Sequence, residues 1–267
     1  MLDELAAKIR AIERRYAGTD PRPAQAPSIP TGWAEVDELL GGGFDGGALH
    51  EWFGTQPTAT NVRLPWTPPL CLMSYLAWQA FKAGGETFWT MWIGGQCFPF
   101  PRMLVRADGT DRRLLERSIF VTVPDAASRL WAMDLALRSP AIGAVFADGS
   151  GFNMAATRRL HLVARAHRTS TFAVRPSNER FALSAAQSRW LVAWQPDVAD
   201  ADTARPRWRI ELLRCKGVSP VNGARVWTVE WDNAQCAVRL SAPLVTAAGR
   251  AKSETTTRPS TARQQSA

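Results

Sequence analysis

Residues 30–54 read PTGWAEVDELLGGGFDGGALHEWFG, and this stretch decides how the fold begins. A short helix leads into three glycines, a glycine turn follows at 45–47, and residues 48–53 form an apolar strand that ends at Gly54. A strand placed in this way is the approach to a nucleotide-binding phosphate loop. In such a loop, G-x-x-x-x-G-K-[ST] supplies backbone N–H groups, a lysine and a hydroxyl.

The phosphate loop itself is missing. Residues 55–66 read TQPTATNVRLPW, without Gly-Lys-Thr, and Pro57 and Pro65 each remove a backbone donor. We interpret the degenerate loop from Gly54 to Trp66 as scaffold rather than as half of an active site. We therefore expect no bound cofactor, no catalytic residue and no enzymatic activity.

Size and composition favour one sizeable domain with appendages. The chain has 267 residues, is 46% hydrophobic and carries a formal charge of +8, which permits contact with nucleic acid without establishing it. No apolar run reaches the ~18 residues of a membrane span, and the N-terminus lacks the basic region of a secretory signal. The four cysteines are far apart, which predicts a reduced cytoplasmic setting and no metal site.

Strands alternate with helices through the middle of the chain, which predicts an α/β fold: a mostly parallel sheet flanked by helices. Beyond residue 188 the short runs RWLVAW, RWRIELLRC, VWTVEWD and CAVRLSA predict a β-rich C-terminal part made of antiparallel strands. The expected strands cover 87–93, 118–123, 141–147 and 171–174, and the expected helices cover 70–83, 126–138 and 154–168.

Composition also suggests where the chain divides. The expected parts are an N-terminal helix within 1–17, a Pro/Ala-rich linker at 18–28, the core at 29–187, its β-rich extension at 188–246, and a disordered basic tail at 247–267. The N-terminal helix has one apolar side. It is therefore expected to dock on a partner, on a second copy or on its own domain.

The order of elements resembles the RecA-like core. Within that group it is most similar to the ImuA family, RecA-like accessory proteins of bacterial mutagenic translesion synthesis. The similarity covers roughly residues 28–235. Besides the opening stretch it is carried by FPFP at 98–101, LWAMDLALRS at 130–139, GAV at 143–145, RRLHLVAR at 158–165, RP at 175–176, SAA at 184–186 with Arg189, and RCKG at 214–217.

The resemblance also accounts for the lost nucleotide site, because ImuA-like proteins generally have a degraded phosphate loop. Gln96 stands where RecA-like ATPases place the glutamate that activates water, and an amide cannot act as a general base. Asp148 ends a buried strand at the relic Walker B position, where it would hold Mg²⁺ through water. The alternative for Asp148 is a strand-end turn with Gly149. The stretch 149–153, at the position of the first DNA-binding loop, is very short.

Two basic sets are candidate contacts for DNA or a partner protein. The first lies on one face of the helix at 154–168, and the second lies on and after a predicted strand that also holds Trp208. The alternatives are a solvated helix face for the first set and a charge-protected edge strand for the second. The first set is Arg158, His161, Arg165 and Arg168, and the second is Arg205, Arg207, Arg209, Arg214 and Lys216.

Hydrolase chemistry is not expected from this sequence. The chain has three histidines, and no Ser/His/Asp or Cys/His constellation stands out. His50 and Glu51 are neighbours in a strand and therefore point to opposite faces of the sheet, which makes them a poor acid–base pair.

The resemblance implies a non-catalytic accessory role in DNA-damage-induced mutagenic translesion synthesis, carried out through protein contacts. The implied partners are an ImuB-like Y-family polymerase homologue, an error-prone C-family polymerase and the RecA filament. The implied location is the cytoplasm, and the nucleoid during DNA damage, with no membrane contact. Three alternatives stay open: a SulA-type cell-division inhibitor, a DNA-binding RecA-like module, and a live ATPase with an unconventional loop.

Overall fold

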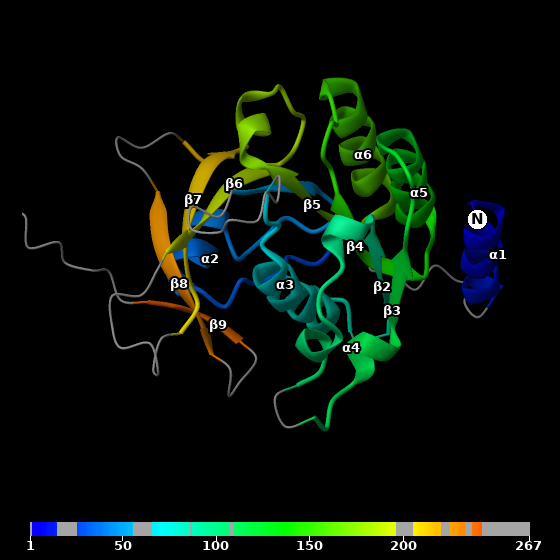
Figure 1. Ribbon diagram of the computed structural model, residues 1–267, viewed down its shortest axis with the longest axis horizontal. Coiled ribbons are helices and arrows are strands. Elements are labelled where there is room, and N and C mark those ends of the chain that lie inside the picture. The colour runs from blue at the N-terminus through cyan, green and yellow to red at the C-terminus, as the bar shows by residue number, and fades with distance from the viewer. Residues whose placement is uncertain are drawn as a thin grey trace, which may run out of the picture.

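One large sheet organises the molecule (Figure 1). The computed structural model describes residues 2–14, 26–55, 66–85, 87–106, 109–195, 205–219, 225–232 and 237–241. In this part of the chain the nine strands are β1 (Leu49–Gly54), β2 (Trp89–Ile93), β3 (Ser118–Val121), β4 (Ile142–Asp148), β5 (Ser170–Pro176), β6 (Ser188–Gln195), β7 (Arg207–Cys215), β8 (Val226–Asp232) and β9 (Ala237–Leu240).

Of the described α-helices, the first two precede β1 and the other four lie between successive parallel strands, as the sequence predicts. Three short 3₁₀ segments follow β2 and β5. The α-helices are α1 (Leu2–Glu13), α2 (Ala34–Leu40), α3 (Leu70–Ala83), α4 (Arg113–Glu116), α5 (Ala126–Arg138) and α6 (Met154–His167), and the 3₁₀ segments are η2 (Gly95–Cys97), η3 (Pro101–Leu104) and η4 (Ser177–Phe181).

The strand order is β3-β2-β4-β5-β1-β6-β7-β8-β9. The pairs from β3 to β6 are parallel, and those from β6 to β9 are antiparallel. The predicted α/β class with a mostly parallel sheet and a β-rich C-terminal part is therefore confirmed.

The four C-terminal strands are antiparallel to one another, as predicted. What the prediction did not include is the parallel pairing of β6 with β1 on its other side. Its sequence alone could not decide this, because an apolar strand covered on both faces has the same pattern in either direction. The extension therefore continues the main sheet rather than forming a separate β-layer.

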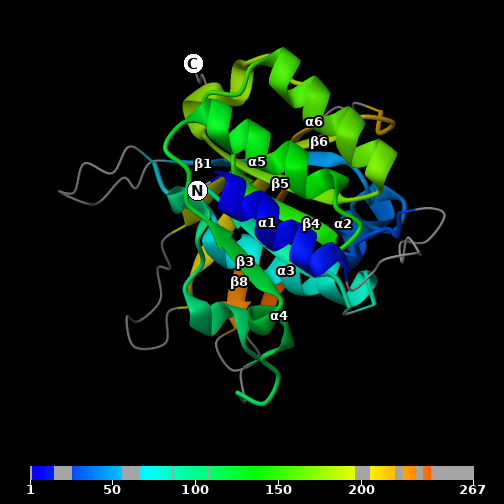
Figure 2. The same cartoon turned by 90° about the vertical axis from the view of Figure 1, so that its right-hand side faces the viewer.

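Helices cover both faces of the parallel part. The side chains of Leu49 and Val145 face α5 and α6, whereas Trp52 and Phe146 face α3. This two-sided burial explains why the central strands read as continuous apolar runs. On the first face α1 adds Leu5 and Ile9, both buried in the same apolar cluster as α5 (Figure 2). The N-terminal helix therefore docks on its own domain, one of the three possibilities that the sequence left open.

The glycine-rich turn before β1 has a packing role. The chain at Ile29 pairs with Phe44, exchanging two backbone hydrogen bonds of 2.9 and 2.8 Å. A Cβ on Gly43 would collide with the Ile29 carbonyl, and one on Gly46 would collide with the Pro27 carbonyl. These glycines therefore let the incoming chain lie directly on the turn, which places the Phe44 ring inside the core.

Four rings surround Phe44 in the centre of the α3-side core. Its ring meets His50, Trp52, Phe172 and Trp190 edge-on, with centroids 5.0 to 5.8 Å apart. Trp52 and Trp190, on adjacent strands, stack with centroids 5.3 Å apart. The register between β1 and β6 is thus fixed by aromatic packing as well as by backbone pairing.

This stack predicts a position-specific loss of stability. Trp190→Ala should lower the free energy of unfolding by about 3–5 kcal/mol, because Trp190 is fully buried and its removal leaves a cavity. The matched control is Trp194→Ala on the same strand, where the side chain is 53% exposed. Urea denaturation followed by circular dichroism measures both variants, and equal losses would contradict the assignment of β6 to the core.

Candidate functional site

The carboxyl edge of the parallel strands is the place to look for a site, because open α/β sheets bind ligands there. The structure brings three predicted features to this edge: Gly54 at the end of β1, Asp148 at the end of β4, and Pro176 at the end of β5. In the sheet β5 lies between β1 and β4. Residues 56–65 of the degenerate loop lie outside the described part of the chain.

The Asp148 carboxylate is occupied by neighbouring groups. One oxygen accepts from the Ser150 backbone N–H at 2.9 Å and from the Ser150 hydroxyl. The other lies 3.6 Å from Nε of Arg129, whose Nη2 donates to the Ser150 carbonyl at 2.7 Å. Both charged side chains are largely buried. Arg129, reaching over from α5, therefore supplies the positive charge that a metal ion would bring to a Walker B aspartate.

Gly94 makes room for this ion pair. Gly94 has φ 91° and lies directly after β2, and a Cβ there would stand 2.9 Å from Asp148 Cβ and 3.0 Å from Arg129 Cδ. A side chain at this position would push the arginine away from the carboxylate. The glycine thus has a second reason to be there besides its backbone conformation.

A buried charge network runs from the middle of β1 to the carboxyl end of β5. Glu51 on β1 is fully buried and accepts from Arg175 Nη1 of β5 at 2.6 Å and from Arg189 Nε of β6 at 2.8 Å. Arg175 also donates to the Phe152 carbonyl at 2.7 Å and to Glu179 at 2.6 and 2.9 Å. We call Glu51, Arg175, Arg189 and Glu179 the Glu51 network.

This network ties three adjacent strands together and uses most of its own hydrogen-bonding capacity. The guanidinium carbons of Arg175 and Arg189 lie 5.8 and 4.8 Å from the centre of the Phe53 ring. Among the described residues, Arg189 Nη2 is enclosed without a hydrogen-bond partner. A buried, mutually neutralised cluster of this kind is a structural element, because its charges are not presented to a ligand.

Two further predicted positions are Gln96 and the turn at 149–153. Gln96 is exposed in η2. The short connection at 149–153 is closed by a hydrogen bond from Phe152 N to the Gly149 carbonyl at 3.2 Å, and Gly151 N donates to Glu179 at 3.0 Å. The predicted first DNA-binding loop is thus a tight turn fastened to η4.

The first basic set does share one side of α6, but its members already make contacts. His161 Nδ1 accepts from the Leu49 backbone N–H at 3.4 Å, and Arg165 forms a 2.6 Å ion pair with Asp45. Burial is the main cause that lowers the His161 pKa to about 4, with nearby Lys216 and Arg165 adding to it. Arg168 takes a left-handed conformation at the end of the helix, and Arg158 is exposed.

The second basic set divides into two groups. Near the start of β7, Arg205 and Arg207 both pair with Glu230 of β8, at 3.1 and 2.9 Å, and Arg209 pairs with Glu211 at 3.1 Å. The alternative of a charge-protected edge strand is wrong, because β6 and β8 flank β7 on both sides. The three arginines instead pair with carboxylates on β7 and β8.

The second group, at the end of β7, points toward the chain between η4 and β6. Arg214 Nη2 donates to the Ser184 and Ala186 carbonyls at 2.9 and 3.0 Å, and Lys216 Nζ donates to the Ala185 carbonyl at 2.6 Å. Burial lowers the pKa of both side chains. These two cations therefore fasten a loop while both residues remain exposed.

A serine–histidine pair, not foreseen from the sequence, lies beside the Glu51 network on the opposite face of the sheet. His50 and Ser188 are neighbours across β1 and β6, with His50 Nδ1 2.7 Å from Ser188 Oγ and His50 Nε2 3.0 Å from the Asp45 carbonyl. Since a carbonyl only accepts, Nε2 carries the proton and Nδ1 accepts from the Ser188 hydroxyl.

This pair is built for structure rather than for nucleophilic attack. The Ser188 oxygen also accepts from the Trp190 indole at 2.8 Å, and both His50 and Ser188 are 1% exposed. Burial lowers the His50 pKa to about 4, so the ring stays neutral. The hollow of about 370 Å³ beside it, lined in part by Asp45, Cys215 and Lys216, therefore meets no accessible nucleophile of this pair.

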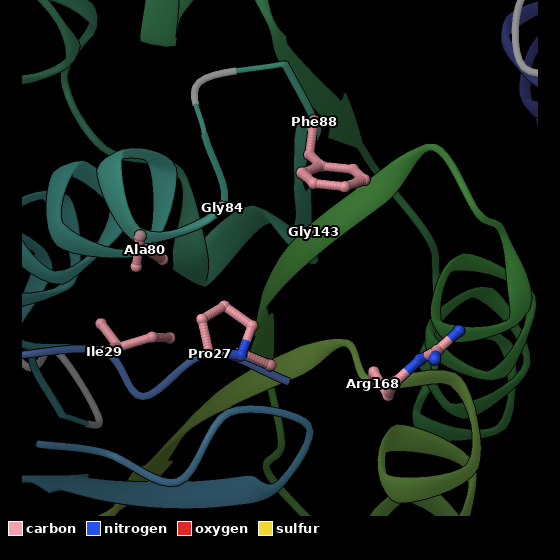
Figure 3. Close-up of a pocket in the computed structure, with 9 residues that line it drawn as sticks. Pro27, Ile29, Ala80, Gly84, Phe88, Gly143 and Arg168 are labelled. Atoms are coloured by element: carbon pink, nitrogen blue, oxygen red, sulfur yellow. The ribbon is translucent and has the colours of Figure 1, made fainter. Parts of the chain in front are cut away.

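A second cavity lies near the amino ends of β4 and β5. Figure 3 shows it between Ile29, Phe88, Gly143 and Arg168, and its volume is about 60 Å³. Nucleotide-sized ligands need pockets of several hundred Å³. This cavity is consequently a packing defect and not a nucleotide site.

Within the described ranges, no group of three or more His, Cys, Asp or Glu side chains is arranged to hold a metal ion. Nor does any helix in those ranges have the length and apolar character to cross a bilayer.

The Glu51 network gives a prediction about stability. Glu51→Leu alone should cost about 3–5 kcal/mol of unfolding free energy, because it leaves two buried guanidinium groups without their shared carboxylate. The triple variant Glu51→Leu, Arg175→Met, Arg189→Met should recover most of that loss, since no uncompensated charge remains. Urea unfolding measures both. A triple variant less stable than Glu51→Leu would refute this account of the network.

His50 gives a prediction about pH. Its folded pKa lies below the unfolded value of 6.5, so its contribution to stability is complete above pH 6.5 and is lost as the pH falls toward 4. Between pH 7 and 5 this loss is about 2 kcal/mol. His50→Gln should be less stable at pH 8 but should lose less over that interval. Urea midpoints at the two pH values test this, and an unchanged slope would assign the effect to other groups.

Comparison with known proteins adds no relative to these observations. No protein-family model matches the chain, and a search of the curated proteins finds no match. What can be said about function therefore depends on the geometry of the carboxyl edge and of the surfaces around it.

Proposed function

We propose that this chain is a non-catalytic RecA-like accessory protein of DNA-damage-induced mutagenic translesion synthesis. It acts through contacts with partner polymerase subunits. The partners in this proposal are an ImuB-like Y-family polymerase homologue and an error-prone C-family polymerase, with the end of a RecA filament as a further docking place. The working location is the cytoplasm, at the nucleoid during DNA damage.

The observation that carries the proposal is a nucleotide-binding type of sheet whose carboxyl edge is filled by its own ion pairs. One strand, β5, separates β1, which leads to the lost loop, from β4, which ends at Asp148. RecA-like ATPases use that arrangement, and it supports the resemblance seen in the motifs. The Arg129–Asp148 and Arg175–Glu179 ion pairs lie at the edge itself.

A sheet of this type with ion pairs at its carboxyl edge favours a role that depends on protein-binding surfaces. A RecA-like ATPase uses nucleotide to change how neighbouring subunits fit together. When Arg129 holds Asp148 permanently, no exchange of nucleotide is available to drive such a change. The helices and loops around the sheet persist, and they offer fixed docking surfaces for proteins of the replication and repair machinery.

The proposal predicts that the protein's role in cells does not require a catalytic step. Deleting the gene should lower mutation frequency after ultraviolet irradiation toward the uninduced level. Asp148→Asn should restore it at a temperature where circular dichroism shows the variant folded, because no catalytic step uses the carboxylate and asparagine still accepts from Ser150 N. The lost charge opposite Arg129 lowers stability only. Mutation frequency to drug resistance is the readout, and wild-type complementation is the control. Robust ATP hydrolysis by the pure protein, abolished by Asp148→Asn, would overturn the proposal.

The same cells and protein separate the alternatives. Filamentation on expression, with binding to the tubulin-like division protein, would favour a SulA-type inhibitor. DNA affinity that falls steeply with salt would favour a DNA-binding module, because phosphate contacts dominate such binding. The proposal expects neither of these results, and it expects co-purification with the polymerase partners.

A further inference from the structure

An exposed apolar surface lies at the carboxyl edge of the sheet. Among the described residues eight large apolar side chains are exposed, and four of them belong to η4, the residues after it, and α6. Phe181 and Leu183 are each 79% exposed, Leu162 is 57% exposed and Met154 is 43% exposed. We call these four side chains, together with Arg158 and Arg180, the η4–α6 patch.

The loop that carries Phe181 and Leu183 is held firmly from both sides. Before them, Glu179 binds Arg175 and accepts from Gly151 N. After them, Ala185 N donates to Thr157 Oγ1 of α6 at 3.1 Å. The carbonyls at 184–186 accept from cations at the end of β7. The two side chains are therefore held outward by a fixed backbone.

The α6 part of the patch continues from the loop. Met154, Arg158 and Leu162 recur at four-residue intervals, which places them along one side of the helix. Figures 1 and 2 both show the η4 coil beside the amino end of α6. The two apolar groups thus face solvent at the same end of the molecule.

The charges around this surface indicate which kind of partner segment it can bind. Arg158 is exposed, and the Arg180 guanidinium lies 4.2 Å from the centre of the Phe181 ring. The nearby carboxylate, Glu179, is already paired with Arg175. The patch is therefore apolar with a positive rim, and its complement is an apolar segment with acidic residues.

We propose that the η4–α6 patch docks an amphipathic helical segment of a partner protein, with apolar side chains on one face and aspartate or glutamate beside them. This inference deepens the proposed function and rests on one part of it, namely that the protein acts as a docking scaffold. A rigid aromatic and leucine pair beside arginines has the composition of an interface anchor.

Two other occupants fit less well. Nucleic acid prefers open aromatic faces for stacking, but Arg180 covers one face of Phe181, and the other three apolar side chains are aliphatic. A second copy would bring two positive rims together, and the chain as a whole carries +8. Neither occupant matches both the apolar centre and the charge of the rim.

Peptide display on the full-length protein tests the proposal. A library of random 16-residue peptides is selected against the wild-type chain, and enriched peptides are resynthesised for fluorescence anisotropy. We expect helical spacing of apolar residues and an excess of acidic residues. The double variant Phe181→Ser, Leu183→Ser should weaken binding by about 30-fold or more, as for interface anchors.

A charge-reversal variant and a control variant test whether binding depends on this patch. Arg158→Glu with Arg180→Glu should weaken the same peptides, whereas Phe100→Ser, which removes an exposed side chain elsewhere, should not. Circular dichroism checks that each variant is folded. The proposal fails if no enriched peptide depends on Phe181 and Leu183. It also fails if the double variant instead loses binding to a 30-nucleotide oligo-dT, or loses self-association in sedimentation.

Such peptide binding depends on the patch alone and not on the cellular role. If the display result holds and damage-induced mutation is unaffected by deletion, the proposed function falls while the docking surface remains. If deletion abolishes induced mutation but display yields no dependent peptide, the proposed function stands and partners dock elsewhere.

Discussion

The shared burial of Glu51 between Arg175 and Arg189 is the interaction on which the edge of this sheet depends. It joins three adjacent strands through side chains, from the middle of β1 to the carboxyl end of β5. Taking three charges out of water is expensive, and only their close mutual contact offsets the cost. The carboxyl edge is consequently rigid, and Glu179 extends that rigidity to η4 and to the turn at 149–153.

The sequence predicted the architecture well because its signals are local. Apolar runs bounded by glycine, proline and aspartate placed every parallel strand within a few residues, and the helices at 70–83 and 126–138 have the predicted bounds. The direction of β6 was beyond reach, since direction depends on pairing and not on pattern. The loop contacts of the two cations at the end of β7 were not predicted, because a sequence does not show which carbonyls a lysine or arginine will reach.

The candidate site, like the fold, has features that the sequence predicts and features that it does not. That Glu51 and His50 face opposite sides was predictable from strand alternation, but their partners, Arg175 and Ser188, come from strands more than a hundred residues away in the chain. Glu51 within an otherwise apolar strand was the available signal of a buried ion pair. Arg129 gave none, because an arginine in the first turns of an amphipathic helix ordinarily faces solvent.

The Arg129–Asp148 pair has a consequence for how such a protein is controlled. A protein that binds a ligand is stabilised by it in proportion to the logarithm of ligand concentration, and so senses the ligand. In the proposed non-catalytic role a tethered arginine takes that place at constant effective concentration. Under that proposal folding would not vary with the nucleotide pool, and the number of copies that the cell makes and keeps would set the protein's output.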